Sequence, residues 1–561
     1  MNSYKLCLLL IASLASSTSL FAQSRTYIIK FGDKPPTPSA ESTLSKKSLE
    51  RRAKFKIALN TEDLPVNKDY VAAISGIGGI SMRYSLKWQN AVVVNATSHA
   101  IDSAKTLSFV KSTAYVGRSK PNYAPEKAQF VSPVVKLKES TMNTAQLTAV
   151  DYGASYFQNQ QIEIDHLHQA GFDGAGVTVA VLDAGFNSIH KIPSFQKHQA
   201  NGLLTFGYDI AGLDNELNIQ DNHGTAVSSC IGGYDLGNYI GSAPKAHLVL
   251  FRTEFADTEY PIEELNWCKA AELADSIGVD MLTSSLGYNQ YDDKALSYTH
   301  TDLDGKTSYI SQAARTATQK GIIVLNSAGN SGNNKWRKIG TPADASEVLS
   351  VGAVNKVGRP GRFTSQGYNA LGQVKPDISA LGVLATVASP SGAYYQGNGT
   401  SYSTPIAAGG VACLIQAFPN IHPDTIKNAI RLTATKSIMP DSFVGYGIVQ
   451  YYTAYRYLSQ RSQSDAKAEI LSQSDTFINI YTANATELSY DLYRHKKLLW
   501  IFPSKKKVIS STITCCNRFL RINLRDSRIK CNEKFSLKVT LNSSGGTQTL
   551  SSTGKVGCTA E

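Results

Sequence analysis

The sequence contains few of the features that mark membrane proteins and metal-binding proteins. Its one strongly apolar run near the N-terminus, residues 6–14, is too short to cross a bilayer. No later stretch reaches the necessary length, so we expect no membrane span. Only 8 residues are cysteine, and Cys230, Cys268 and Cys413 stand singly among apolar neighbours, without the spacing of metal ligands. We therefore expect these three thiols to be buried, and we identify no metal-binding residues.

The first 22 residues have the layout of a secretory signal peptide. Lys5 precedes the apolar run, and small and hydroxyl-bearing residues follow it up to Ala22. This layout predicts a secreted or extracellular protein, with a periplasmic or cell-surface location left open. An oxidising compartment would allow disulfides, whose pairing the sequence does not define, among the four cysteines of the tail: Cys515, Cys516, Cys531 and Cys558.

The excess of positive charge is confined to the tail. The chain has a formal net charge of +12, from 56 Lys and Arg against 44 Asp and Glu. Residues 491–561 alone contain 14 Lys and Arg and 4 Asp and Glu, so the rest of the chain is nearly neutral. No RNA- or DNA-binding motif accompanies these basic residues, and we expect them to be solvated rather than to bind nucleic acid. A tail that binds nucleic acid or a surface is the alternative.

Changes in composition divide the chain into five segments. They are a signal peptide at 1–22, a small α+β domain at 23–118, a linker at 119–150, an α/β domain at 151–458 and a C-terminal extension at 459–561. The small domain has strand-like runs at residues 27–31, 91–95 and 109–116, and one charged helical stretch at residues 49–56. The linker contains Pro and Lys with weak periodicity. The extension is basic and rich in Ser, which predicts a small β module or a partly disordered tail.

The α/β domain alternates short apolar runs with helical stretches. Each run is long enough for one strand buried on both faces, at residues 177–182, 247–251, 279–282, 322–325 and 348–354. Helical stretches at 262–277 and 309–320 lie between them. This alternation predicts a parallel sheet with helices on both faces. Small residues at Gly409 and Gly410 also predict a closely packed helix after Ser401.

Four polar residues lie at the ends of predicted strands or the starts of helices in this domain. Taken singly, each has a simple structural interpretation. Asp183 could be a turn or cap residue, His223 a capping or core histidine, and Asn330 a turn residue in a left-handed conformation. Ser401 could be a helix N-cap. None of the four therefore indicates catalysis by itself.

Together these four residue types supply what acyl transfer needs. The reaction requires a hydroxyl nucleophile, an imidazole base, a carboxylate that orients the imidazole, and donors directed at the developing oxyanion. The chain order Asp, His, Ser is one of the known orders for such triads. The competing nucleophile elbow, Gly-x-Ser-x-Gly, is excluded because Ser403 occupies the position of its second glycine.

Four motifs resemble the signature blocks of the subtilase family, peptidase family S8. They are Asp183-Ala184-Gly185, His223-Gly224-Thr225, Ser327-Ala328-Gly329-Asn330 and Gly399-Thr400-Ser401-Tyr402-Ser403-Thr404-Pro405. The resemblance covers about residues 151–458 and implies a subtilisin-like three-layer α/β fold. It also implies a serine endopeptidase with Asp183, His223 and Ser401 as the triad and Asn330 in the oxyanion hole. The resemblance implies that an extended polypeptide substrate binds along Ser285, Leu286, Gly287, Ala328 and Gly329.

The resemblance extends, more loosely, to the small domain at 23–118, which is similar to the inhibitory propeptide of subtilases. It implies a zymogen whose propeptide is its own intramolecular inhibitor, and we expect a monomer that needs no cofactor. Calcium as a structural ion is left open, because the acidic loop has no recognisable ligand spacing in Asp292, Asp293, Asp302 and Asp304.

One position departs from the family pattern. The family usually has Thr or Ser after the catalytic Asp, and this sequence has Ala184 there. The departure removes no member of the triad, so we expect activity to survive. The alternative is a catalytically inactive, secreted binding protein that keeps the subtilase fold.

Overall fold

The structure is a computed structural model. It describes residues 25–34, 39–118, 147–215, 217, 221–461, 467–473, 477–483, 487–498, 502–514, 518–524, 534–543 and 546–555. The predicted signal peptide, most of the predicted linker and the four cysteines of the tail lie outside the described residues. Across the described ranges, no helix is both long and apolar enough to cross a membrane.

The N-terminal unit is a four-stranded antiparallel sheet covered on one face by two helices. The strands lie in the order β2 (Ile80–Leu86), β3 (Ala91–Ala96), β1 (Arg25–Phe31) and β4 (Val110–Gly117). The covering helices are α3 (Lys68–Ser75) and α4 (Ser98–Lys105). A further helix, α2 (Lys46–Phe55), lies between the short helices η1 (Ala40–Thr43) and η2 (Thr61–Asp63). The sequence predicted β1, α2, β3 and β4, whereas β2, α3 and α4 were not predicted because few of their side chains are buried.

The central unit contains a seven-stranded parallel sheet. Its order is β15 (Ile378–Leu381), β12 (Leu349–Val354), β11 (Ile323–Ser327), β10 (Met281–Ser284), β5 (Thr178–Asp183), β9 (His247–Arg252) and β6 (Leu204–Asp209). Five of these strands match the predicted apolar runs. The two outer strands, β6 and β15, were not predicted, since β6 is interrupted by Gly207 and β15 has only four residues. The predicted fold class, a parallel sheet within an α/β domain, is confirmed.

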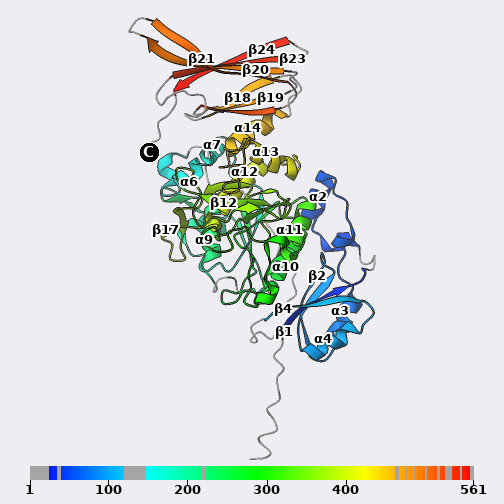
Figure 1. The fold of residues 1–561 in the computed structure, drawn as a ribbon. Helices are drawn as coiled ribbons and strands as arrows, with labels where there is room; N and C mark the ends of the chain where they lie inside the picture. The colour runs from blue at the N-terminus through cyan, green and yellow to red at the C-terminus, as the bar shows by residue number, and fades with distance from the viewer. Residues whose placement is uncertain are drawn as a thin grey trace, which may run out of the picture.

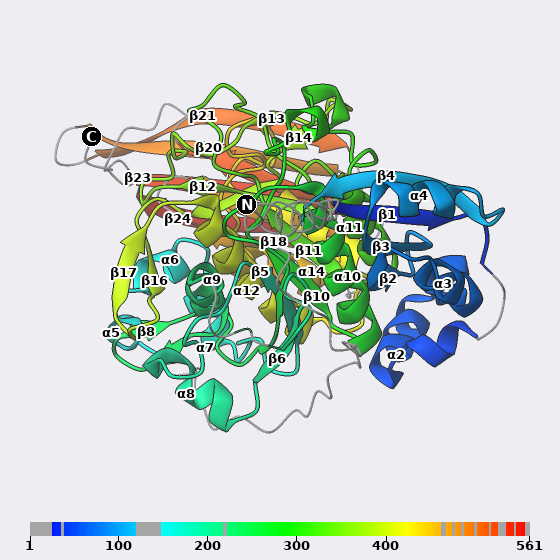
Figure 2. The ribbon, with the colours of Figure 1, turned by 90° about the horizontal axis from the view of Figure 1, so that it is seen from below.

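Helices cover both faces of this sheet (Figures 1 and 2). On one face the core is closed by α9 (His223–Gly232), α12 (Thr400–Ala417), α13 (Pro423–Thr433) and α14 (Tyr451–Arg461). On the other face it is closed by α10 (Pro261–Ile277) and α11 (Tyr309–Gln319). The predicted close packing of α12 is present, since a methyl group at Gly409 would overlap Ser242 and one at Gly410 would overlap Tyr451.

Shorter elements complete the central unit. The helices are α5 (Ala149–Tyr152), α6 (Tyr156–Gln160), α7 (Ile164–Gln169), α8 (Pro193–Ala200), η3 (Lys294–Leu296) and η4 (His300–Asp302). Three two-stranded sheets pair β7 (Tyr234–Asp235) with β8 (Tyr239–Ile240), β13 (Gly367–Tyr368) with β14 (Val374–Lys375), and β16 (Ala385–Ala388) with β17 (Tyr394–Gly397). As predicted, Cys230, Cys268 and Cys413 are buried, and their thiols are free.

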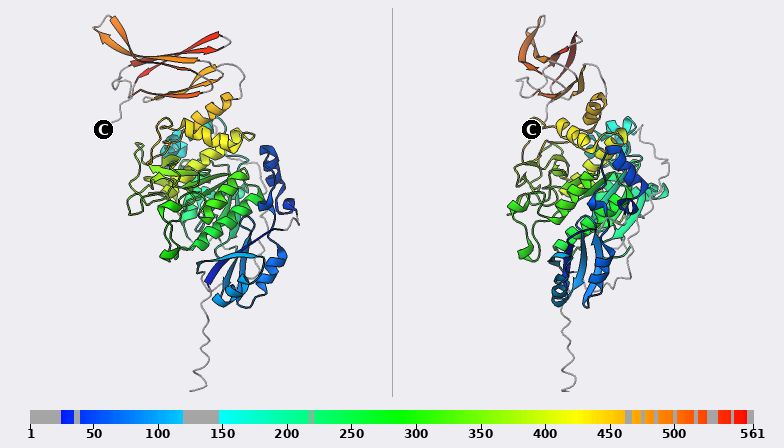
Figure 3. Two further views of the ribbon diagram at one scale, coloured as in Figure 1. Left: turned by 45° about the vertical axis from the view of Figure 1, so that its right-hand side comes forward. Right: turned by 90° about the vertical axis from the view of Figure 1, so that its right-hand side faces the viewer.

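The N-terminal unit packs against α10 and α11 (Figure 3). Its open sheet face contributes Ile28, Tyr84 and Val93 to the same apolar cluster as these two helices. Glu272 of α10 accepts hydrogen bonds from the backbone nitrogens of Lys87 (3.0 Å) and Trp88 (2.8 Å). At the other end of the helix, Gly117 of β4 lies so close to Tyr260 that a methyl group at Gly117 would overlap the tyrosine ring. The N-terminal unit therefore contacts α10 along its length.

The C-terminal unit is built from two antiparallel sheets next to α14 (Figure 1). One contains β18 (Lys467–Gln473), β19 (Phe477–Ala483) and β22 (Arg518–Asn523). The other contains β21 (Phe502–Thr514), β20 (Glu487–Leu498), β23 (Lys534–Ser543) and β24 (Gly546–Lys555). The views in Figures 1 and 3 place this unit at the opposite end of the central unit from β1–β4. The predicted boundaries between the five segments remain predictions.

Candidate active site

The four candidate residues meet at one edge of the parallel sheet. Asp183 is the last residue of β5, and Asn330 follows the end of β11. His223 is the first residue of α9, and Ser401 is the second residue of α12. The carboxyl ends of the strands form this edge, which is where parallel α/β sheets place their ligand sites. Residues up to 218 positions apart in the sequence are thus gathered by the topology of the sheet.

Asp183 and His223 form a partly buried hydrogen bond. The distance from His223 Nδ1 to Asp183 Oδ1 is 2.8 Å, and the aspartate side chain is completely buried while the imidazole is 29% exposed. Burial lowers the pKa of His223, but the charge of Asp183 and its hydrogen bond outweigh this effect and raise the pKa above its ordinary value of 6.5. Asp221 accepts a hydrogen bond from the His223 backbone nitrogen at 2.7 Å. The pair is therefore arranged so that the carboxylate fixes the imidazole and stabilises its charged form.

The other carboxylate oxygen of Asp183 receives no hydrogen bond from the residues that the structure describes. Oδ1 also accepts from the Ala184 backbone nitrogen at 2.8 Å, whereas Oδ2 is buried and has no hydrogen-bond partner among the described residues. This is the position where the sequence departs from the family pattern, because Ala184 brings no hydroxyl group. The carboxylate is thus less fully solvated than a buried charge usually is.

Asn330 is oriented by Thr400, the residue before the candidate nucleophile. Its Oδ1 accepts from the Thr400 backbone nitrogen at 2.9 Å and from the Thr400 hydroxyl at 3.0 Å. These two bonds direct the amide nitrogen, Nδ2, away from Thr400. A methyl group built on Gly399 would lie 3.8 Å from Asn330 Nδ2 and 3.7 Å from Ser401 Cβ, so both groups border the same small volume. An amide donor is therefore held beside the candidate nucleophile.

Ser401 lies in the first turn of α12, only 9% exposed. Its hydroxyl donates to the Ser285 carbonyl at 3.4 Å, and the Ser285 hydroxyl donates to the Ser401 carbonyl at 2.8 Å. Because the first backbone N–H groups of a helix have no partner within it, the Ser401 N–H is a second donor at this position. The next residue, Tyr402, places its ring centroid 6.4 Å from that of His223. The start of α12 therefore lies next to the imidazole.

The segment after β10 leaves an unpaired backbone beside Ser401. The Leu286 carbonyl accepts from Asn326 Nδ2 at 2.8 Å and from the Ser327 hydroxyl at 3.2 Å. Tyr288 forms an isolated bridge with Thr341. Between these anchors Gly287 is exposed, and no hydrogen bond from another described residue reaches its backbone. The predicted substrate-binding strand is thus accessible and fixed at both ends.

Ala328 and Gly329 lie between this segment and Asn330. Ala328 is fully buried, and its backbone nitrogen donates to the Val351 carbonyl at 3.0 Å. Gly329 has φ of +103°, a conformation that favours glycine, and its nitrogen donates to the Thr400 hydroxyl at 3.2 Å. Thr400 therefore links the turn that carries Asn330 to the helix that carries Ser401.

Two contributors to the site were not singled out from the sequence. Thr400 lies within a quoted motif, but only the structure reveals that it orients Asn330. Glu254 follows β9 and is buried, with its carboxylate bonded to the Tyr288 hydroxyl at 2.6 Å and to the Thr253 hydroxyl at 2.7 Å. Burial raises the pKa of Glu254 to about 7, and its charge adds to the effects that raise the pKa of His223. Its position two residues after the end of β9 was the available signal.

The acidic loop does not present a metal site. Among the described residues, no cluster of three or more His, Cys, Asp or Glu side chains could hold a metal ion. Three of the loop carboxylates instead accept hydrogen bonds from nearby backbone nitrogens. Asp293 accepts from Ala295, Asp302 from Thr299, and Asp304 from Lys306. The residues present in this loop therefore do not fit a calcium site.

Comparison with known proteins relates the chain to one family. Residues 174–447 match the model described as "Subtilase family", and residues 26–130 match "Peptidase S8 propeptide domain, Bacteroidota". Subtilisin E from Bacillus subtilis (strain 168) is 26% identical over 446 residues, which cover 78% of this chain and 97% of that protein. Serine protease AprX from the same organism is 30% identical over 287 residues, covering 46% of this chain and 61% of AprX. A solved structure of the prenylagaramide maturation protease PagA has 23% identity and a TM-score of 0.41, covering 52% of this chain and 96% of PagA.

Proposed function

Because this chain belongs to the subtilase family of serine peptidases, peptidase family S8, we propose that it cleaves peptide bonds of extended polypeptides with the triad Asp183, His223 and Ser401. Family members are serine endopeptidases and need no catalytic cofactor. The observation that carries the assignment to these residues is the 2.8 Å bond between His223 and Asp183 at the sheet edge that also holds Ser401 and Asn330.

In the proposed reaction, the Ser401 hydroxyl attacks the scissile carbonyl carbon while His223 accepts the hydroxyl proton. Asp183 keeps the imidazole in the required tautomer and stabilises the imidazolium that forms. The tetrahedral intermediate collapses when the C–N bond breaks and His223 returns the proton to the leaving amine. Water then repeats the sequence on the acyl-enzyme, which releases the second product and restores the Ser401 hydroxyl.

The oxyanion of the tetrahedral intermediate is stabilised by two donors. Asn330 contributes Nδ2. Its Oδ1 accepts the two hydrogen bonds from Thr400, so Nδ2 is directed away from Thr400 and can donate to the oxyanion. Ser401 contributes its backbone N–H, and the positive end of the α12 dipole adds to the effect. These donors are in place before the substrate binds, so they need no reorganisation during the reaction.

The substrate is an extended polypeptide segment. It pairs with the exposed backbone at Gly287 as an added β-strand, which gives affinity without requiring a particular sequence. Leu286 and Gly287 on one side and Ala328 and Gly329 on the other border the pocket for the residue before the cleaved bond. Small walls of this kind leave room for a bulky apolar side chain.

Export and latency complete the proposal. Residues 1–22 direct secretion of a monomeric precursor, and residues 23–118 act as an inhibitory propeptide that is removed later. A parallel sheet forms many contacts between residues distant in sequence, so its folding is slow and a folded template accelerates it. The contacts of the N-terminal unit with α10 and α11 support this role.

Covalent labelling tests the assignment directly. A fluorophosphonate probe is expected to modify the processed protein at Ser401, because only an activated hydroxyl reacts with it. Mass spectrometry of the labelled peptide identifies the residue. The alternative function, an inactive binding protein with the same fold, predicts no labelling at all, and labelling at a residue outside 399–405 would contradict the assigned nucleophile.

A hydroxyl group restored beside Asp183 is expected to change the pH profile. In Ala184→Thr, a donor to the unpaired Oδ2 would disperse the carboxylate charge and so lower the raised pKa of His223. Catalysis needs the neutral imidazole and is lost as the pH falls through this pKa, so the acid limb of kcat/KM should move roughly half a pH unit lower. Ala184→Val, which has the same shape without the donor, is the control. Equal shifts in both variants would rule out the hydrogen bond as the cause.

A further inference from the structure

Residues 39–64, here called the arm, extend from the N-terminal unit to the far ends of α10 and α11. The arm contains η1, α2 and η2 and lies between β1 and α3 in the chain, outside the four-stranded sheet. Figure 3 shows α2 beside the central unit, away from β1–β4. It reaches Asp280 and Ile323, at the amino ends of β10 and β11, whereas Ser401 lies at the carboxyl edge of the sheet. The arm therefore contacts the edge opposite to the candidate active site.

The two helices end in glycines over which the arm packs directly. Gly278 follows α10 with φ of +91°, and Gly321 follows α11 with φ of +84°. A methyl group at Gly278 would lie 2.7 Å from the backbone nitrogen of Ser48, and one at Gly321 would lie 2.9 Å from Ile57 Cδ1. The first distance leaves no room for a side chain at Gly278, and a side chain at Gly321 would displace that of Ile57. The surface is therefore shaped closely to the arm.

Polar groups of the arm satisfy carbonyls that the helices leave without partners. The last carbonyls of any helix have no intrahelical donor. At the end of α10, the Ser45 nitrogen donates to the Ser276 carbonyl at 2.9 Å, and its hydroxyl donates to the Ile277 carbonyl at 2.8 Å. After α11, Arg51 Nε donates to the Lys320 carbonyl at 3.0 Å. The arm thus caps both helices from outside their own unit.

Buried charges on the two sides form ion pairs with each other. Arg52 Nη2 lies 2.8 Å from Asp275 Oδ2 of α10 and 2.8 Å from Asp63 Oδ1 of the arm, and Arg51 also pairs with Asp275. Lys320 of the central unit lies 3.1 Å from Asp63. All five side chains are at most 4% exposed. Since a buried charge that loses its partner is strongly unfavourable, each unit depends on the other at this place.

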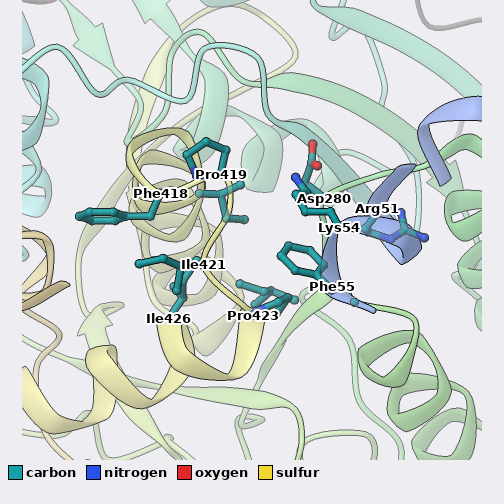
Figure 4. A pocket seen from close by; sticks show the side chains of 12 residues that line it. Arg51, Lys54, Phe55, Asp280, Phe418, Pro419, Ile421, Pro423 and Ile426 are labelled. Atoms are coloured by element: carbon teal, nitrogen blue, oxygen red, sulfur yellow. The ribbon is translucent and has the colours of Figure 1, made fainter. Parts of the chain in front are cut away.

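An apolar contact extends the same surface. Phe55 packs its ring edge against His422 with centroids 5.6 Å apart. Figure 4 shows Phe55 facing a hollow whose other side is formed by the segment between α12 and α13 and by the start of α13. The apolar lining on this side comes from the end of α12, the connecting segment and the start of α13, and consists of Ile415, Phe418, Pro419, Ile421, Pro423 and Ile426. The docking surface therefore combines helix ends, a buried acid and an apolar wall.

We propose that the ends of α10 and α11, with Asp275, form a docking site for the arm, and that this contact sets how long the cleaved propeptide remains bound. The inference rests on the proposed role of residues 23–118 as an inhibitor. Because the arm and the β-sheet face belong to one unit, both contacts must open together before that unit leaves, and the combined affinity exceeds that of either contact. The arm thereby controls access to Ser401 from the opposite edge of the sheet.

The test measures binding without using the activity of the chain. The reference is full-length Ser401→Ala with a recognition sequence for a site-specific protease inserted between residues 119 and 146. After it is cut there, the protein is diluted. Size-exclusion chromatography then measures the fraction of N-terminal unit that stays bound to the rest of the chain. We expect Arg51→Ala with Arg52→Ala to raise the dissociation constant at least ~100-fold, because Asp275 then loses both arginine partners and keeps only the more distant Lys87 at 3.8 Å. Before cutting, the linker holds the units at millimolar effective concentration, so the variant still folds, which thermal unfolding of the uncut chain verifies.

Lys46→Ala on the same helix is the matched control. Lys46 is 91% exposed, and among the described residues its one ion pair is with the exposed Glu50. The dissociation constant of this variant should therefore stay within about twofold of the reference. The milder Ser45→Ala, which removes one cap of α10, should give an intermediate increase. Equal dissociation constants for the double arginine variant and Lys46→Ala would overturn the proposal, as would complete release of the reference upon cutting. Failure of the proposed function would instead appear as absent fluorophosphonate labelling of the unmutated chain.

Discussion

Replacing Ser401 with alanine is expected to lower kcat by roughly 10⁶-fold, a magnitude known from subtilisin, a relative of this chain. The loss is this large because, in the proposed reaction, the Ser401 hydroxyl is the nucleophile, and the neighbouring hydroxyls of Ser403 and Thr404 donate to the Thr400 carbonyl within the helix. The residual rate over water would come from the oxyanion donors and from substrate binding. Steady-state cleavage of a peptide substrate by the processed protein measures the effect.

Ser403→Ala supplies the control for this substitution. Ser403 lies two residues later in α12 and is fully buried, and its hydroxyl donates to the Thr400 carbonyl at 3.1 Å within the helix. Its loss should cost about 1 kcal/mol of stability and leave kcat nearly unchanged. If Ser401→Ala retained more than a thousandth of the activity, or if Ser403→Ala lost as much, the assignment of the nucleophile would be wrong.

Removing the side-chain amide of Asn330 is expected to lower kcat by about 10²–10³-fold with little change in KM, a range also taken from subtilisin. In the proposed reaction this donor acts on the oxyanion, which exists only along the reaction path. Its loss therefore reduces the stabilisation of the transition state rather than the binding of the substrate. The variant is Asn330→Ala, and the measurement is the separation of kcat from KM on a peptide substrate.

A second variant distinguishes this role from a purely structural one. Asn330→Asp keeps an oxygen that can accept the hydrogen bonds of Thr400 but has no amide donor. It should therefore be at least as impaired in kcat as Asn330→Ala while its thermal stability stays close to that of the unmutated protein. A raised KM with an unchanged kcat in both variants would place Asn330 in substrate binding instead.

The sequence predicted the elements that are buried on both faces and missed those that are not. Continuous apolar runs identified β5, β9, β10, β11 and β12, because strands in the middle of a parallel sheet are apolar throughout. The outer strand β6 carries half-buried residues and a glycine, so its apolar run is broken. The role of α2 could not be predicted from the sequence either. A charged helix is usually solvated, and only the tertiary structure reveals that Arg51 and Arg52 are buried.

The residue types of the site were predictable, but their hydrogen bonds were not. The motifs placed Asp183, His223, Asn330 and Ser401 at strand and helix ends, and the structure locates all four at one edge of the sheet. Their assignment to catalytic roles stays a prediction until activity is measured. The partner of Asn330 Oδ1 and the unpaired Asp183 Oδ2 depend on contacts between residues far apart in the chain, which no local pattern encodes.

The length of α10 sets the distance between two contacts of the N-terminal unit. Gly117 of β4 abuts Tyr260 just before the helix begins, while Ser45 meets Ile277 at its last turn. The 17 residues in between fix a span of about 25 Å, at a rise of 1.5 Å per residue. One residue inserted in or deleted from α10 would turn one end by about 100° relative to the other. The length of α10 therefore determines whether the end of β4 and the arm can contact the helix at the same time.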